Sequence, residues 1–302
     1  MSKIACSLAL CSLPHALCII MMWIEDLRQA CKDRLIGNEL FFFSEIDSTN
    51  REAHDRARGG AREGTVILAD SQSRGKGRRG RSWESPSGAN LYLSIILRPP
   101  ICPSHAPQIT LLAGVAAARA LSGVSGLECL IKWPNDIFLR GKKLAGILAE
   151  MEGEGSKVRF VILGIGVNVN WRREDFPADL GVMATSLHAE SGKEISRAAA
   201  AAELFRELEK EYTAFLREGF SARLKDEWNR LSWINGKQVT LSSPEGTLSG
   251  RALGLDTDGA LLLLDGEGKT RRFIAGDVSL QRINKDEWDT DEHRKVPKVR
   301  NA

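Results

Sequence analysis

Residues 71–83 read SQSRGKGRRGRSW, and the rest of the chain is best interpreted outward from this stretch. Five of its thirteen residues are cationic and three are glycine. Glycine lets a backbone come close to a ligand because it has no Cβ, and arginine binds phosphate through two parallel hydrogen bonds. Since no apolar residue precedes Trp83, the pattern predicts a mobile basic loop. Two interpretations of this stretch are possible at this point: a phosphate-binding loop, or an arginine–glycine segment that binds nucleic acid.

Two polar segments further along the chain favour the phosphate-binding loop. Residues 132–136 read KWPND, and residues 141–146 read GKKLAG. They combine lysines with a carboxylate, and the small Ala145 and Gly146 leave room for a flat ligand. Nucleotidyl transfer needs cationic groups on the phosphates and a carboxylate for Mg²⁺. The basic loop lacks the Lys-Ser/Thr ending of a Walker motif, which disfavours a P-loop kinase.

The composition is that of an ordinary globular chain. Its 302 residues are 43% hydrophobic and 27% charged, and the formal net charge is only +3, so the molecule as a whole is no polyanion binder. None of the six cysteines forms a C-x-x-C pair, which favours reduced thiols in a cytosolic protein over a zinc or redox site. No uninterrupted run of ~18 apolar residues occurs, so we predict no transmembrane helix.

The first 22 residues have two open interpretations. They resemble a weak signal-peptide apolar region, although Pro14 and His15 interrupt it. The pair Met21 and Met22 directly precedes an amphipathic pattern, so a start codon assigned too early is an equal alternative. The amphipathic pattern predicts a short helix over 23–36.

Apolar periodicity predicts the elements that follow. A strand is expected over 40–46, and a helix opens after it because Thr49 and Glu52 have capping-box spacing. Further expected elements are strands over 65–69, 90–97 and 137–139, a buried helix over 108–121, a hairpin of 144–151 and 158–169 joined by 152–155, and a helix over 196–220. The last helix would bury a stripe of Leu204, Phe205, Leu208, Tyr212, Phe215 and Leu216.

The composition changes after Trp233. Between residues 236 and 280, four or five short strand-like runs alternate with turn signals, which is typical of a small barrel. The charged end of the chain lacks apolar periodicity and is predicted to be disordered. The expected units are a leader with a short helix (1–37), a catalytic domain (38–233), a barrel (234–282) and a disordered tail (283–302).

Five motifs in a fixed order carry a family resemblance. They are GKGRRGRSW at 75–83, SPSGANLY at 85–92, KWPND at 132–136, KLAGIL at 143–148 and GIGVNV at 164–169. The chain resembles the biotin protein ligases over about residues 40–282. The resemblance implies an α+β fold with a central mixed sheet flanked by helices, related to class II synthetases, and a C-terminal SH3-like barrel.

The resemblance also implies a two-step reaction with ATP and biotin as substrates and Mg²⁺ as cofactor. The biotin carboxylate attacks the α-phosphate of ATP and forms biotinyl-5′-AMP and pyrophosphate. A lysine of the biotin carboxyl carrier protein of acetyl-CoA carboxylase then attacks the mixed anhydride and releases AMP.

Site residues follow from the resemblance position by position. Lys143 and Arg78 would be catalytic, and Asp136 would hold Mg²⁺. Biotin would contact Ser48, Thr49, Asn50, Gln72, Lys76, Gly77, Arg78, Lys143, Gly146 and Leu148, with Thr49 and Gln72 bonding the ureido and ring groups. The ATP or adenylate moiety would contact Gly75, Arg78, Arg81, Trp83, Lys132, Asn135, Asp136 and Asn168, with Trp83 near the adenine. Residues 74–82 would be disordered without ligand and ordered by the adenylate.

The sequence departs from the family in two places. Lys76 stands where the family usually has arginine, so the bidentate fork is lost there. The segment before the first strand shows no helix-turn-helix pattern with a basic recognition face, so we predict a cytoplasmic ligase without repressor function, DNA partner or membrane contact, as a monomer or homodimer. The alternatives are a lipoate–protein ligase, which shares the fold, and a nucleic-acid-binding protein that uses the basic loop.

Overall fold

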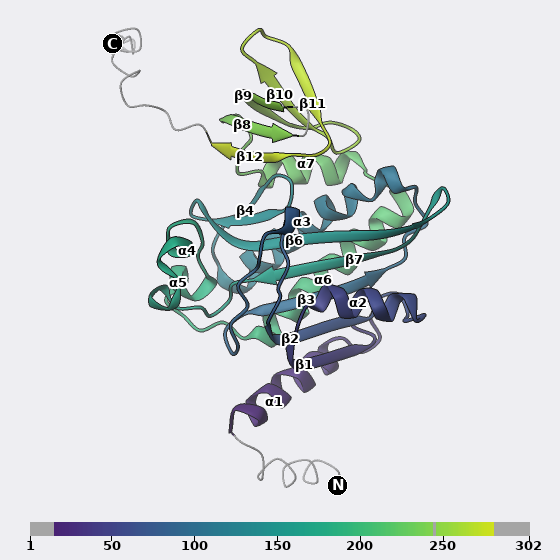
Figure 1. The fold of residues 1–302 in the computed structure, drawn as a ribbon, viewed down its shortest axis with the longest axis vertical. Coiled ribbons are helices and arrows are strands. Elements are labelled where there is room, and N and C mark those ends of the chain that lie inside the picture. The colour runs from purple at the N-terminus through teal and green to yellow at the C-terminus, as the bar shows by residue number, and fades with distance from the viewer. Residues whose placement is uncertain (1–14, 244–245, 281–302) are drawn as a thin grey trace, which may run out of the picture.

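A mixed sheet of seven strands forms the centre of the fold (Figure 1). The computed structural model describes residues 15–243 and 246–280, with side chains from residue 23 onward. The strand order is β1-β2-β3-β7-β6-β5-β4; β1 and β2 are parallel, and the other neighbours are antiparallel. The strands are β1 (Leu40–Ile46), β2 (Val66–Gln72), β3 (Leu91–Leu97), β4 (Cys129–Lys132), β5 (Asp136–Leu139), β6 (Lys142–Glu154) and β7 (Lys157–Val167).

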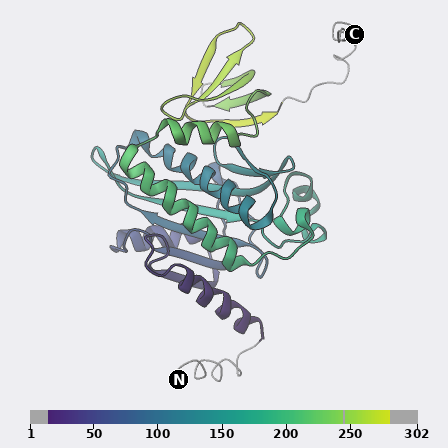
Figure 2. The same cartoon turned by 180° about the vertical axis from the view of Figure 1, so that it is seen from behind.

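Helices cover both faces of this sheet, which confirms the predicted α+β class. Helix α2 (Thr49–Arg58) packs on β2, β3 and β7 at one face. Helices α3 (Pro107–Ser125) and α6 (Arg197–Glu218) pack together on the other face, as the reverse view shows (Figure 2). The remaining helices are α1 (His15–Ala30), α4 (Ala178–Met183), α5 (Leu187–Ser191) and α7 (Ala222–Leu231), with short 3₁₀ turns at Arg78–Gly80, Pro103–His105 and Arg173–Asp175.

Strand β3 shows how the sequence separates the two faces. Its odd-numbered residues from 91 to 97 belong to the large core beneath α3 and α6, whereas Ile96 belongs to the smaller core beneath α2. This alternation follows because successive side chains of a strand point to opposite faces. Tyr92 and Ser94 therefore share the α2 face, and both are buried there. A strand that reads as uniformly apolar thus brings two hydroxyl groups to one side of the sheet.

Helix α3 is a core helix. The helical stretch Pro103–Ser125 is long and apolar enough to cross a membrane by length and composition, but 67% of its apolar window is buried inside the protein. A helix that is apolar on all sides is typically buried in the core of a large domain.

The C-terminal strands form a second sheet that packs beside α7 at one end of the large sheet (Figure 1). It is antiparallel, with the order β11-β10-β9-β8-β12. The predicted small β domain is confirmed, and five short antiparallel strands are consistent with an SH3-like barrel. The strands are β8 (Gln238–Ser243), β9 (Gly246–Leu255), β10 (Leu261–Asp265), β11 (Thr270–Phe273) and β12 (Asp277–Leu280).

Two boundary predictions and one burial prediction are wrong. The predicted helix over 23–36 ends at Ala30, because Asp33 and Gly37 have φ values of 64° and 89° that a right-handed helix cannot contain. The turn between β6 and β7 is centred on Gly155 (φ 62°), so most of the predicted connection 152–155 belongs to β6. In α6, Leu216 is 39% exposed and lies outside the buried stripe. The predicted tail, 283–302, lies outside the described residues.

Candidate active site

The predicted biotin-binding residues meet in a small cavity at the N-terminus of α2. Its volume is about 50 Å³, and we call it the small cavity. The sequence interpretation did not single out Tyr92, Gly164 and Gly166, which also line it. All ten residues that the resemblance assigns to biotin line this cavity: Ser48, Thr49, Asn50, Gln72, Lys76, Gly77, Arg78, Lys143, Gly146 and Leu148.

Four hydrogen-bonded side chains, Thr49, Asn50, Gln72 and Ser94, form what we call the floor of the small cavity. The backbone N–H and the hydroxyl of Thr49 both donate to Gln72 Oε1, at 2.8 and 3.1 Å. Ser94 Oγ lies 2.8 Å from Thr49 Oγ1 and 2.6 Å from Asn50 Oδ1, and its single hydroxyl hydrogen can be donated to one of them at a time. Ser94 is fully buried and does not line the cavity, so it supports the floor from behind.

The predicted capping box of Thr49 and Glu52 is wrong. Ser48 is the N-cap of α2, and its side chain makes no capping hydrogen bond. Thr49 is the first helical residue and bonds Gln72 instead. The tertiary contact with β2 thus replaces the local cap that the sequence spacing suggests.

Glycines on neighbouring strands make room for the floor. The strand register aligns Ser94 of β3 with Gly164 of β7, and aligns Gly166 of β7 with Gly146 of β6. A Cβ at Gly164 would overlap Asn50 Oδ1, and a Cβ at Gly166 would lie 2.6 Å from the Trp83 ring. Both distances are too short for real carbon contacts, so only glycine fits at these two positions.

Trp83 lies between the floor and a neighbouring cavity, which we call the large cavity. Its ring lies over Gly146 and Gly166, and the indole lines both the small cavity and a larger one of about 850 Å³. The buried Nε1 has no hydrogen-bond partner within the part of the chain that the structure describes. The indole thus forms a wall of both cavities, and its position near the adenine stays a prediction.

Lys143 is placed where the two cavities meet. It lines both of them, and its Nζ lies 2.8 Å from Asp136 Oδ1 and 5.3 Å from the centre of the Trp83 ring. The register pairs Asp136 of β5 with Gly146 of β6, which brings the carboxylate to the same row of the sheet. An ammonium group at this junction can contact a ligand in either cavity.

The large cavity is lined by five of the residues predicted for the nucleotide: Arg81, Trp83, Lys132, Asp136 and Asn168. Burial lowers the pKa of Lys132, and the carboxylate of Asp136 opposes this effect. A partly desolvated cation of this kind is stabilised when an anion binds beside it. Asn168 is buried, and its Nδ2 donates to the Thr185 carbonyl, so its side chain braces the cavity wall.

One wall of the large cavity was missed by the sequence interpretation. It is apolar and comes from the segment around α4, where Val182 and Met183 are 73% and 65% exposed. The signal in the sequence is an apolar run, GVM at 181–183, that no helical or strand period explains. The residues of this wall are Trp171, Pro177, Leu180, Val182, Met183 and Ala184.

The basic loop, residues 74–82, is folded against the C-terminal sheet. The loop closes on itself, since Gly77 N–H donates to the Arg81 carbonyl at 2.7 Å and Trp83 N–H donates to the Gly75 carbonyl at 2.9 Å. Three of its four arginines converge on one carboxylate of β12: Arg78 and Arg79 each lie 3.1 Å from Asp277, and Arg81 also pairs with it. The sequence could not reveal this partner, which lies almost two hundred positions away.

The structure gives the loop two anchors that the sequence interpretation lacked, Asp277 and the packed Trp83 ring. The expected disorder of residues 74–82 without ligand stays a prediction. Burial lowers the pKa of Arg78, and Asp277 opposes this effect. The guanidinium also donates to Asn135 Oδ1 at 3.0 Å. The Asp277 carboxylate therefore stabilises the charged form of the partly buried Arg78 guanidinium.

Two residues predicted to contact the nucleotide also have structural partners within the protein. Asn135 Nδ2 donates to the Ile147 carbonyl at 2.8 Å and fixes the turn between β4 and β5 onto β6. Gly75 is buried at the base of the loop, where a Cβ would clash with Trp83 and Ser85. Neither residue lines the large cavity. Trp133, by contrast, is a core residue that is only 2% exposed.

The residues present fit a magnesium ion only in company with a phosphate ligand. Among residues 23–243 and 246–280, no group of three or more His, Cys, Asp or Glu side chains could hold a metal. Mg²⁺ is usually bound through one or two carboxylates together with substrate phosphates. Asp136, at the edge of the large cavity, supplies one such carboxylate.

Comparison with known proteins identifies the class. A model of the biotin/lipoate A/B protein ligase family matches residues 42–168. A model of the biotin protein ligase C-terminal domain matches residues 235–281. The fold and the site thus define a ligase of the biotin and lipoate type.

The relatives narrow this class. The chain is 40% identical over 256 residues to the bifunctional ligase/repressor BirA of Bacillus spizizenii, covering 85% of this chain and 78% of that one. It is 34% identical over 261 residues to the biotin--[acetyl-CoA-carboxylase] ligase of Mycobacterium tuberculosis, covering 83% and 94%. The structure of the Aquifex aeolicus biotin protein ligase in complex with biotin and ATP superposes with a TM-score of 0.70 at 29% identity, covering 82% and 100%. The chain belongs to the biotin protein ligase family, and it is a ligase enzyme.

Proposed function

We propose that this chain activates biotin with ATP and transfers it to a lysine of an acceptor protein. In the first step a biotin carboxylate oxygen bonds the α-phosphorus while the bond to pyrophosphate breaks. In the second step the lysine amine bonds the biotin carbonyl carbon, the bond to AMP breaks, and the amine proton is lost to solvent. The observation that carries this proposal is the position of Lys143 at the junction of the small and large cavities.

Lys143 would act on the charge that develops between the two ligands. Bound biotin would extend its carboxylate from the small cavity towards the large one, where ATP would lie. The ammonium group would then contact both the carboxylate and the α-phosphate. A fixed cation at the point where charge develops is one of the largest contributions to catalysis of this kind. In the ligand-free arrangement Asp136 neutralises Lys143 at 2.8 Å.

The basic loop would close over the reacting groups. Arg78 would exchange Asp277 for the phosphate, while Arg79 and Arg81 could keep the loop on β12. Asp136 would hold Mg²⁺ together with the phosphates of ATP, and the ion would neutralise the charge of the leaving pyrophosphate.

The acceptor proposed here is the biotin carboxyl carrier protein of acetyl-CoA carboxylase. The support is the name of the Mycobacterium tuberculosis relative, a biotin--[acetyl-CoA-carboxylase] ligase. We further propose a cytoplasmic location, because the described cysteines Cys31, Cys102 and Cys129 are free thiols and burial raises the pKa of Cys31 and of Cys129 to about 11. We also predict that the protein is a monomer or a homodimer and that it does not bind DNA.

The first experiment measures pyrophosphate release from Mg·ATP in the presence of biotin, with lipoate as the control. Release that depends on biotin would support the adenylation step. Release with lipoate alone would retain the fold and change the ligand to that of a lipoate–protein ligase. Release with neither would contradict the proposed function and return the basic loop to consideration as a nucleic-acid site, which salt-dependent filter binding of single-stranded nucleic acid would test.

A further inference from the structure

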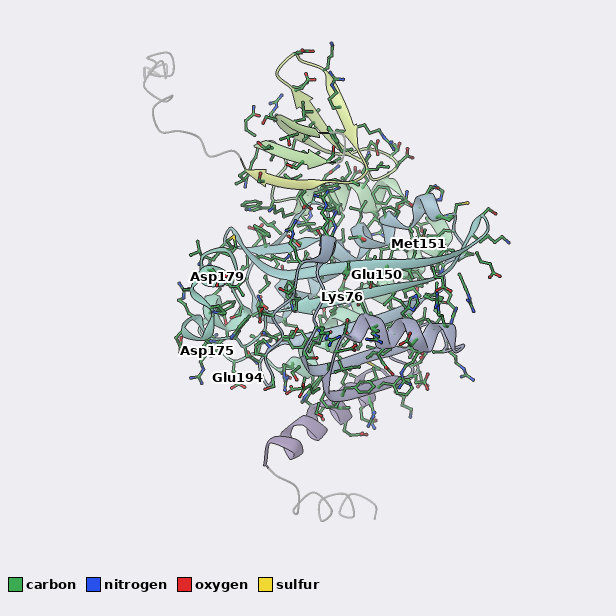
Figure 3. All side chains as sticks on the ribbon, in the orientation of Figure 1. Lys76, Glu150, Met151, Asp175, Asp179 and Glu194 are labelled. Carbon is green, nitrogen blue, oxygen red and sulfur yellow. The ribbon has the colours of Figure 1, made fainter. Side chains whose placement is uncertain are left out.

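Among the described residues, two lysines line the small cavity, Lys76 from the basic loop and Lys143 from β6. Lys76 is exposed and lies near the N-terminal end of α2 (Figure 3). Its backbone is held by a β-bridge to Ser82 and by the two hydrogen bonds that close the loop on itself. The flexible four-carbon side chain of Lys76 therefore starts from a fixed point at the edge of the small cavity.

The two amines differ in their partners. Lys143 Nζ lies 2.8 Å from Asp136 Oδ1. Within the part of the chain that the structure describes, the Lys76 side chain has neither an ion pair nor a hydrogen bond. A nearby opposite charge favours the charged form of an amine, whereas only the neutral form carries the lone pair that attacks a carbonyl. Lys143 is thus suited to bind oxygen atoms as a cation, and Lys76 is the amine available for reaction.

Lysine at position 76 can react in a way that arginine cannot. The family usually has arginine there, and a guanidinium group stays protonated in proteins. A primary amine, by contrast, forms covalent bonds with reactive carbonyl groups. Under the proposed function, the biotinyl carbonyl of the mixed anhydride would lie beside Lys143, at the cavity that Lys76 also lines. The chain thus holds a free amine next to its own acylating agent.

We propose that Lys76 is a self-modification site: when no acceptor protein is present, its amine takes the biotinyl group from the adenylate formed in the same active site. The Lys76 nitrogen forms an amide bond to the biotinyl carbonyl carbon, and the bond from that carbon to the phosphate oxygen breaks. AMP leaves with the electron pair, and the amine proton passes to solvent. This inference rests on the proposed function and extends it to a second acceptor within the chain.

Tethering favours Lys76 over the amines of other molecules. A reactive group on a short flexible tether has an effective concentration on the order of millimolar. Free lysines of neighbouring protein molecules are far more dilute in an assay, so Lys76 should react before them. An acceptor protein that docks at the active site would compete with Lys76. Self-modification is therefore expected when the acceptor is absent.

The test incubates the full-length protein with biotin and Mg·ATP without an acceptor protein. Cleavage after Glu63 and Glu84 then releases peptide 64–84, in which Lys76 is the only lysine. Mass spectrometry should find a biotinyl group on this peptide. Peptide 129–150, which carries the other lysine of the small cavity, should remain unlabelled. Pyrophosphate release without label on peptide 64–84, or equal labelling of the two peptides, would overturn the inference.

Two variants identify the site from the total amount of covalently bound biotin. Lys76→Arg keeps the positive charge but has no primary amine, so covalent biotin per chain should fall about tenfold or more. The matched control is Lys157→Arg, at an exposed lysine that lines neither cavity, and it should be labelled like wild type. Because Lys76→Arg can also impair adenylate formation, all three proteins are compared again with biotinyl-5′-AMP supplied directly. Undiminished labelling of Lys76→Arg under these conditions would contradict the proposal.

A mixing experiment distinguishes attack within one active site from attack on adenylate that has left it. Wild type is incubated with an affinity-tagged Lys143→Ala chain, which retains Lys76 but should form little adenylate. With both chains at about micromolar concentration, label should accumulate on the wild type and not on the tagged chain. Equal labelling of the two chains would show that free adenylate is the reagent and would overturn the inference.

The inference and the proposed function can fail separately. If no pyrophosphate is released with biotin, but supplied biotinyl-5′-AMP labels Lys76 selectively, the proposed function fails and the inference stands. If pyrophosphate release depends on biotin, but neither ATP with biotin nor supplied biotinyl-5′-AMP labels Lys76, the inference fails alone.

Discussion

The small cavity is bounded on one side by the floor and on the other by the basic loop, and the two differ in burial. In the floor, Thr49, Asn50 and Ser94 are buried, and their hydrogen bonds link α2, β2 and β3. In the loop, the side chains of Arg79 and Arg81 are 44% and 67% exposed, and a single carboxylate of a different sheet holds them.

This difference separates selection from closure. Buried hydrogen bonds between short side chains are retained when the ligand leaves, because breaking them would leave unpaired polar groups in the interior. Exposed ion pairs contribute little, on the order of 0–1 kcal/mol each, and salt screens them. The floor is thus suited to recognise a head group, and the loop is suited to open, close and exchange Asp277 for a phosphate.

The largest effect is expected where the two sides meet, at Lys143. Lys143→Ala should reduce biotin-dependent pyrophosphate release by about 100- to 1000-fold, because a fixed cation at the reacting phosphate is lost. The melting temperature should change little, since the side chain is partly exposed. Lys157→Ala, an exposed lysine at the start of β7, is the matched control. A large loss of melting temperature with activity retained would reassign Lys143 to structure.

The next largest effect should come from breaking the floor. Gly164→Ala places a methyl group on Asn50 Oδ1, so it should weaken biotin binding at least tenfold and destabilise the fold by about 1–3 kcal/mol. Titration with biotin and thermal unfolding would measure both. Gly153→Ala is a suitable control, because the nearest atom to its Cβ is the Lys157 carbonyl oxygen at 3.6 Å. Equal behaviour of the two variants would show that the floor tolerates displacement of Asn50.

A smaller effect is expected from freeing the loop. Asp277→Asn removes the charge that Arg78, Arg79 and Arg81 share, so trypsin should cleave at Arg78–Arg79 several times faster than in wild type, with little change in melting temperature. Biotin plus ATP should restore protection, because the adenylate offers a replacement anion. Asp258→Asn, which disrupts only the exposed pair with Arg272, controls for loss of one surface charge. Cleavage at the wild-type rate in Asp277→Asn would remove Asp277 as the anchor of the loop.

The smallest expected effect is that of salt concentration. It also distinguishes the basic loop from the floor most directly. Raising NaCl from about 0.05 M to about 0.5 M shortens the screening length to a few ångströms. Tryptic cleavage of the loop should accelerate a few-fold, whereas the ratio of biotin Kd values between Gly164→Ala and wild type should not change. A salt-dependent ratio would mean that charge, rather than neutral hydrogen bonds, governs the floor.

The sequence determined a large part of this protein. Apolar periodicity gave the strands of the large sheet and the buried helices, because burial of one face imposes a period that is visible without a structure. Ordered motifs identified the family, and the family resemblance supplied ten residues that line the small cavity. Helix ends were predicted less well: the capping box at Thr49 fits the local pattern, but a contact with Gln72 replaces it.

Only the tertiary structure decided which partners complete the site. Ser94 is one small residue in an apolar strand, and its role arises because the β3–β7 register sets it beside Gly164, where Asn50 approaches. Asp277 belongs to a different sheet from the loop that it anchors. Local sequence records which face of an element is buried, since that depends on its own period. It does not record which distant side chain arrives at that face, because strand register and domain packing are properties of the whole folded chain.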